Sequence, residues 1–93
     1  MTDKEIKFYD KRLFKINLAL ESYVDFYGVE PVGLDEVIEK HNKFRVEKDK
    51  MTDKDRLDNC KNLVYEYIKI IDGIGRDKFE FYDDGSVTCK WNH

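Results

Sequence analysis

The sequence has few of the residues that mark a disulfide-rich exported protein or a zinc-stabilised one. Its 93 residues include two cysteines, two histidines and one proline. Small secreted domains usually depend on several disulfides, and structural zinc sites use paired ligands in short spacings such as C-x₂₋₄-C. The two cysteines, Cys60 and Cys89, stand far apart in the chain. We therefore expect free thiols and no metal.

Long apolar runs are also missing. The most apolar stretch, residues 68–74, is interrupted by Lys69 and Asp72. It falls far short of the roughly 20 apolar residues that a membrane-spanning helix needs. The first twelve residues carry charges throughout and lack the apolar centre of a signal peptide. We therefore expect a cytoplasmic protein with no membrane partner.

No catalytic constellation stands out. A nucleophile needs a base beside it, and the two histidines are poorly placed for that role. His41 falls on the apolar face of a predicted helix, where a buried residue that makes one hydrogen bond is expected, and His93 is the terminal residue. The glycine pair Gly73 and Gly75 follows a helix, whereas the dinucleotide-binding motif follows a strand. We therefore predict a protein that is not an enzyme, with no catalytic residues and no cofactor.

The hydrophobic period predicts three helices in a single domain, residues 1–93. Apolar residues recur at three- and four-residue steps, the spacing of one helical face. Thr2 and Glu5 fit a capping box at the start of the first helix, and Gly73 with Gly75 should end the third. The segments 29–33 and 46–51 are predicted to be connections. The helices themselves are expected at residues 2–27, 34–45 and 52–72.

The period changes to two near the C-terminus, which predicts a β-hairpin. The alternating apolar positions are Phe79, Phe81, Val87, Cys89 and Trp91. A three-residue loop ending in Gly85 would set Phe81 opposite Val87 and Phe79 opposite Cys89, so that both pairs share one face. We thus predict an α+β fold in which three helices, long first and third and short second, pack with a C-terminal two-stranded antiparallel hairpin. The first and third helices should form the core pair under the apolar face of the hairpin.

Basic residues are absent from one long stretch of the chain, between Lys15 and Lys40. This gap holds six carboxylates, which the turn between the first two helices should gather at one end of the molecule. They are Glu21, Asp25, Glu30, Asp35, Glu36 and Glu39. A smaller acidic tip on the hairpin comprises Glu80, Asp83 and Asp84. The negative electrostatic field of these carboxylates could steer a basic partner. Alternatively, the carboxylates could simply favour helix N-termini and keep a small domain soluble.

Two further features could carry binding. A basic segment comprises Lys40, Lys43, Arg45, Lys48 and Lys50, and it would either contact phosphates or form a solvated helix end. On the first helix, Phe14 and Leu18 lie away from the main apolar face and on a line with Glu21 and Asp25. Apolar residues on two sides of a helix are either enclosed by other elements or contact a partner, most simply a second copy in a homodimer.

In size, acidity, aromatic content and its uninterrupted carboxylate stretch, the chain resembles the small early proteins with which phages disable host enzymes, in particular anti-restriction and DNA-mimic proteins. The resemblance rests on the six carboxylates of the gap and the three of the hairpin tip. It implies a non-catalytic inhibitor, acting in the host cytoplasm, that presents carboxylates where a DNA duplex presents phosphates to a restriction enzyme or another nucleic-acid-binding protein. The 17 lysines and arginines depart from that pattern, because strong DNA mimics are far more acidic. Two alternatives stay open: a small nucleic-acid-binding regulator using the segment Lys40–Lys50, and an immunity protein against a basic nuclease toxin.

Overall fold

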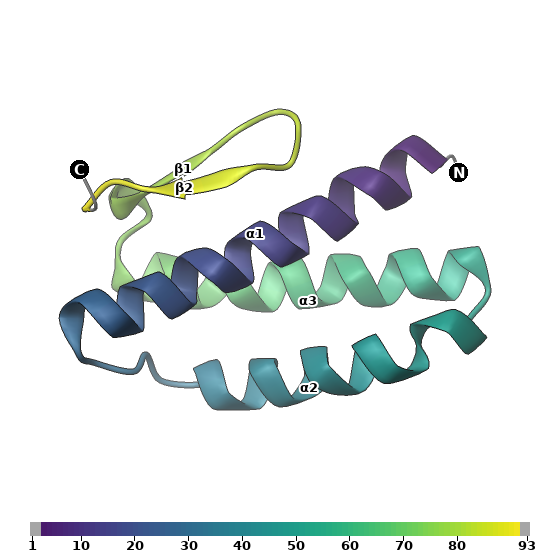
Figure 1. Ribbon diagram of the computed structural model, residues 1–93, viewed down its shortest axis with the longest axis horizontal. Helices are drawn as coiled ribbons and strands as arrows, with labels where there is room; N and C mark the ends of the chain where they lie inside the picture. Colours follow the sequence, from purple (N-terminus) through teal and green to yellow (C-terminus); the bar gives the residue numbers. More distant parts are fainter. Residues whose placement is uncertain (1–2, 92–93) are drawn as a thin grey trace.

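The computed structural model describes residues 3–91 and has the predicted α+β architecture (Figure 1). The helices are α1 (Asp3–Tyr27), α2 (Leu34–Glu47) and α3 (Asp53–Ile74), with short 3₁₀ turns η1 (Lys48–Lys50) and η2 (Arg76–Lys78). The strands β1 (Phe79–Phe81) and β2 (Val87–Cys89) form the C-terminal sheet. None of these described helices is long and apolar enough to cross a membrane. The predicted capping residue Thr2 and the terminal His93 lie outside the described residues.

The helices α1 and α3 run in the same direction, and α2 returns antiparallel to both of them (Figure 1). Their contact face is the centre of the core, where Ile16 and Leu20 of α1 and Tyr67 and Ile71 of α3 are fully buried. The second helix adds a smaller apolar face to the same core, comprising Leu34, Val37 and Phe44. The prediction that the first and third helices form the core pair is therefore confirmed.

The hairpin has the predicted register, with Phe79 opposite Cys89 and Phe81 opposite Val87. The amide of Tyr82 donates to the carbonyl of Ser86 at 2.9 Å, which leaves a three-residue loop that ends in Gly85 at a positive φ of 98°. Phe79 and Val87 are buried, and Trp91 packs against the same core. The hairpin lies mainly along α1, because β2 contacts that helix directly (Figure 1).

Two helix ends differ from the prediction. The third helix runs through Gly73 and ends at Gly75, whose φ of 128° a side chain would disfavour and whose amide donates to the Ile71 carbonyl at 2.8 Å. One glycine, rather than two, stops the helix. The second helix continues to Glu47 and passes directly into η1, so that the predicted connection at 46–51 is mostly helical. Met51, the last residue of the predicted connection, is half-buried against the core.

Candidate functional site

A shallow groove lies where the end of α1 meets the start of α2. Its volume is about 280 Å³, and it is lined by the apolar side chains Val24, Leu34 and Ile38, which are buried or half-buried. Three exposed carboxylates line the same groove: Glu21, Asp25 and Glu30. We call these six residues the acidic groove. The structure therefore brings together three of the carboxylates that the sequence singled out.

The turn between the two helices places Glu30 in the acidic groove. The first helix ends at Gly28, which adopts a φ of 69° and whose amide donates to the Val24 carbonyl at 2.8 Å. The chain then reverses, and Gly33 with a φ of 86° precedes α2. The amide of Leu34 donates to the Pro31 carbonyl at 3.2 Å, which tightens the turn. The glycines matter here because residues that carry a side chain rarely adopt a positive φ.

A fourth carboxylate, Asp35, lies beside the groove and interacts with Glu30. A side-chain hydrogen bond that the protonated Glu30 donates to Asp35, together with the negative charge of Asp35, raises the pKa of Glu30 above its ordinary value. Within residues 3–91, none of the ion pairs of the structure includes Glu21, Asp25, Glu30 or Asp35. The negative charge at this end of the molecule is therefore not neutralised by an ion pair within the described chain.

The remaining two carboxylates of the gap have different surroundings. Glu36 and Glu39 line a separate depression on α2 together with Lys40 and Lys43. Lys40 forms its ion pair with Glu66, and the hydrogen bond and charge of Glu66, followed by the negative charge of Glu36, raise the pKa of Lys40. None of the six carboxylates belongs to an ion pair within residues 3–91, but Glu36 and Glu39 line a depression with two lysines, whereas no lysine lines the acidic groove.

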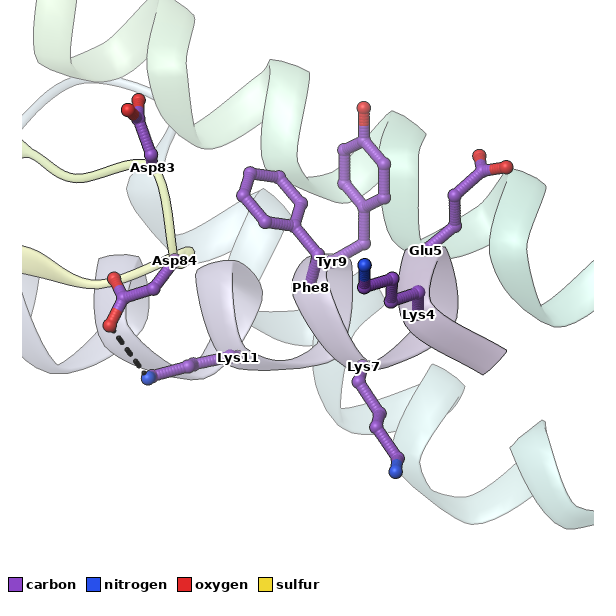
Figure 2. A pocket seen from close by; sticks show the side chains of 8 residues that line it. All are labelled: Lys4, Glu5, Lys7, Phe8, Tyr9, Lys11, Asp83 and Asp84. Carbon is purple, nitrogen blue, oxygen red and sulfur yellow. Dashed lines mark hydrogen bonds and ion pairs between the residues drawn. The ribbon is translucent and has the colours of Figure 1, made fainter. Parts of the chain in front are cut away.

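The acidic tip of the hairpin lies against the basic first half of α1 (Figure 2). Asp84 accepts a hydrogen bond from the Ser86 amide at 2.9 Å and pairs with Lys11 at 3.0 Å, and these contacts lower its pKa to about 2. Asp83 lines the adjacent cavity of about 640 Å³, which also contains Lys4, Lys7 and Lys11. Farther back on β1, Glu80 accepts a hydrogen bond from the Tyr82 hydroxyl at 2.6 Å. Two of the three hairpin carboxylates, Asp84 and Glu80, thus have hydrogen-bond partners within the protein.

Two residues hold the hairpin on α1: Gly85, which the sequence singled out for its loop, and Arg12, which it did not. The Arg12 guanidinium donates to the carbonyls of Tyr82 and Gly85 and lies 5.2 Å from the centre of the Phe81 ring. Gly85 approaches α1 so closely that a Cβ atom would lie 2.8 Å from the Phe8 carbonyl oxygen. A lone arginine in a charged helix gives no sequence signal for this role, although the spacing of Asp83, Asp84 and Gly85 did predict the loop itself.

The basic segment is exposed for the most part and partly neutralised. Lys40 pairs with Glu66 of α3 at 2.8 Å. Lys43, Arg45 and Lys50 are exposed, and Lys48 is half-buried. The segment extends from α2 into η1, so the remaining cations do not form a single helical row.

Phe14 and Leu18 point to solvent, with 52% and 43% of their surface exposed. The sequence left two alternatives for these residues, enclosure by other elements of the chain or contact with a partner. The first alternative is therefore wrong. Both residues lie on the side of α1 opposite the buried Leu13, Ile16 and Leu20. They leave an unpartnered apolar patch in the middle of the longest helix.

The two cysteines are free thiols, as predicted. Burial raises the pKa of Cys60 to about 12, and its Sγ donates to Oδ1 of Asp10 at 3.6 Å. Cys89 Sγ lies 3.9 Å from the Ala19 carbonyl oxygen, and burial raises its pKa as well. A buried, protonated thiol is a poor nucleophile. Among the described residues, no cluster of three or more histidine, cysteine, aspartate or glutamate side chains could hold a metal ion.

His41 belongs to a buried polar chain that crosses all three helices. Its Nδ1 lies 3.0 Å from the Tyr67 hydroxyl, and that hydroxyl donates to Oδ1 of Asn17 at 3.3 Å. Because the single proton of Tyr67 goes to Asn17, the Nδ1–H of His41 is the donor in the first contact. His41 is only 4% exposed, and this burial lowers its pKa to about 4. The prediction of a buried, hydrogen-bonded histidine is confirmed.

Comparisons with known proteins identify no relative of this chain. No protein-family model matches the chain, and neither the curated proteins nor the solved structures contain a match.

Proposed function

We propose that this chain is a non-catalytic binding protein whose acidic groove receives a basic segment of a partner protein. The observation that supports this is the make-up of the groove, which is lined by exposed carboxylates and by buried or half-buried apolar side chains. Lysine and arginine side chains suit such a groove, because their aliphatic stems cover apolar surface while their charged heads reach carboxylates. Carboxylates without ion-pair partners also keep the long-range field that accelerates association with a basic partner.

In its narrower form, the proposal is that the partner is a restriction enzyme or another nucleic-acid-binding protein of a host, and that the chain is a phage-type inhibitor. Proteins that bind nucleic acid present lysines and arginines to phosphates. A protein that covers those cations with Glu21, Asp25, Glu30 and Asp35 would block the nucleic acid from binding. An immunity protein against a basic nuclease would use the same groove, and only the identity of the nuclease separates the two roles.

The experiment is an inhibition assay on purified restriction and toxin nucleases, with binding measured in parallel at low and high salt. We expect inhibition of DNA cleavage that weakens as salt is raised, because salt screens exposed charges. The double variant Glu30→Lys/Asp35→Lys should lose inhibition. The double variant Glu36→Lys/Glu39→Lys introduces the same total charge change beside lysines, so it should retain inhibition and serves as the matched control.

Two results would contradict the proposal. Equal loss of inhibition in both double variants would show that net charge, and not the groove, governs binding. Direct binding of duplex DNA that is lost in Lys43→Glu/Arg45→Glu would instead favour a nucleic-acid-binding regulator.

A further inference from the structure

We propose that two copies of this chain associate through the outer face of α1, which pairs with itself in antiparallel orientation about a two-fold axis at the level of Ile16. The interacting face, here called the outer stripe, runs along the exposed side of the helix. Its six residues are Lys7, Lys11, Phe14, Leu18, Glu21 and Asp25. The inference is separate from the proposed function, and the two are tested by different variants.

The residues of the outer stripe share one helical face. Successive steps of three or four residues keep side chains on the same side of a helix, because 3.6 residues complete a turn. The stripe advances in such steps from Lys7 to Asp25, over most of the length of α1. All six residues are exposed, while the buried positions Leu13, Ile16 and Leu20 lie on the other side of the helix. Figure 2 shows Lys7 pointing away from the side of α1 that carries Phe8 and Tyr9.

The stripe is symmetric in position about Ile16. Lys7 and Asp25 are each nine residues from it, and Lys11 and Glu21 are each five residues from it. Phe14 and Leu18 are each two residues away. A two-fold axis perpendicular to the helix at this level places every stripe residue at the same height as its counterpart on the second copy, and it sets Lys7 and Asp25 directly opposite each other.

The stripe is also complementary in chemistry about the same point. In an antiparallel pair, Lys7 faces Asp25 of the second copy and Lys11 faces its Glu21. Phe14 of each copy then packs against Leu18 of the other, so that the exposed apolar patch is covered at the centre of the contact. A parallel pair would set lysine against lysine and carboxylate against carboxylate. The order of charges along the helix therefore selects the antiparallel arrangement, in which the same surface of both copies is used.

The contacts within one chain leave these charges available. Lys11 pairs with Asp84, yet 43% of its side chain remains exposed, so that its ammonium group can bind a second carboxylate. A face on a single helix makes a small interface, of the size typical of weak and reversible complexes. Association should therefore depend on protein concentration and weaken with salt. Glu21 and Asp25 also line the acidic groove, so a basic partner and a second copy would compete for these two carboxylates.

The experiment measures the dimer dissociation constant of the full chain by sedimentation equilibrium. The substitution Leu18→Glu should give a folded monomer, because it places charge at the apolar centre of the contact. Lys7→Glu and Asp25→Lys should each raise the dissociation constant about five- to tenfold, since each removes two exposed ion pairs and introduces two repulsions. The double variant Lys7→Glu/Asp25→Lys restores both pairs with reversed charge and should return the constant to that of the parent. Circular dichroism verifies folding of each variant.

The outcomes separate this inference from the proposed function. A parent chain that remains monomeric at high concentration overturns the dimer and leaves partner binding intact. A dimer that Lys7→Glu leaves unchanged, or that the double variant fails to restore, overturns the antiparallel contact. Lys7 is not part of the acidic groove, so Lys7→Glu should weaken the dimer while inhibition of the partner persists. The groove variant Glu30→Lys/Asp35→Lys should lose inhibition of the partner and leave the dimer dissociation constant unchanged.

Discussion

In the first half of α1, charged side chains pair with other elements, whereas in the second half the carboxylates have no ion-pair partner among the described residues. Asp10 accepts from Arg56 of α3 at 2.6 Å, Glu5 lies 3.7 Å from Lys61 of the same helix, and Lys11 binds the hairpin. None of the ion pairs within residues 3–91 includes Glu21 or Asp25.

The difference concerns the electrostatic field more than stability. Exposed ion pairs contribute only about 0–1 kcal/mol each, so the second half of α1 loses little stability without them. What it keeps is the potential that the first half cancels by pairing. A net charge of −3 for the whole chain conceals this contrast. Compensation, rather than the number of carboxylates, therefore distinguishes a candidate binding surface from an ordinary charged one.

The largest effects test whether the two halves are equally fixed to the core. Leu13 in the first half and Leu20 in the second are 3% and 0% exposed. Replacing either with alanine should lower the free energy of unfolding by about 3 kcal/mol, the middle of the range for buried leucines. Urea denaturation of the two variants measures this. A large effect in one half alone would show that packing, as well as charge, separates the halves.

A second prediction concerns the buried chain at the border between the halves. The pKa of His41 is about 4 in the folded protein and about 6.5 ordinarily, so the unfolded chain takes up a proton first as the pH falls. Stability should therefore decrease from about pH 6.5 to about pH 4, by up to about 3 kcal/mol from this group. Denaturation across this range, compared with His41→Gln, isolates the contribution. If the variant follows the same pH dependence as the parent, His41 is not its source.

A third prediction tests the attachment of the hairpin to the first half. Arg12→Ala removes two hydrogen bonds to the carbonyls of Tyr82 and Gly85, and it should cost about 2 kcal/mol. Amide hydrogen exchange should show the loss first in the hairpin. Arg45→Ala is the control, since this exposed arginine of α2 should be replaceable with little change. If both substitutions lower the stability equally, the contacts of Arg12 do not hold the hairpin on α1 as proposed.

The smallest effect sharpens the contrast between repelling and compensated carboxylates. Glu30 lies beside Asp35, and a hydrogen bond to Asp35 together with the repulsion between the two carboxylates raises the pKa of Glu30. Glu30→Gln should therefore raise the melting temperature slightly at low salt, and the gain should fade as salt is added. Glu39 lies beside lysines, so Glu39→Gln should leave the melting temperature unchanged or lower it slightly. Differential scanning calorimetry at two salt concentrations distinguishes these signs.

The sequence predicted the elements well where local patterns act alone. The helical spacing placed α1, and the turn residues around Gly85 set the register of the hairpin. The helix ends were less well predicted, because tertiary contacts outweigh propensity there. Gly73 stays helical although glycine disfavours a helix, and it lies within the last turns of α3, where Ile71 and Ile74 pack on the core.

The candidate site was predictable only in part, for a different reason. Position along the chain identified the carboxylates, but some of their partners come from elements distant in sequence. Lys11 neutralises Asp84 although 73 residues separate them. Glu36 and Glu39 lie beside Lys40 and Lys43 on α2, whereas Glu30 enters the groove through the turn. A stretch without lysine or arginine therefore indicates where carboxylates gather, and the fold shows which of them lie together in one groove.

The chain of Asn17, Tyr67 and His41 has a consequence for how uniquely the helices are arranged. Apolar contacts tolerate sliding, because one leucine can replace another in a groove. A buried hydrogen-bond chain does not, since a slip of one helix by a turn would leave these three polar groups unsatisfied, at about 1–3 kcal/mol each. The chain contains one residue from each helix, so it fixes the register of all three at once. It thereby holds the ends of α1 and α2 in the alignment on which the acidic groove depends.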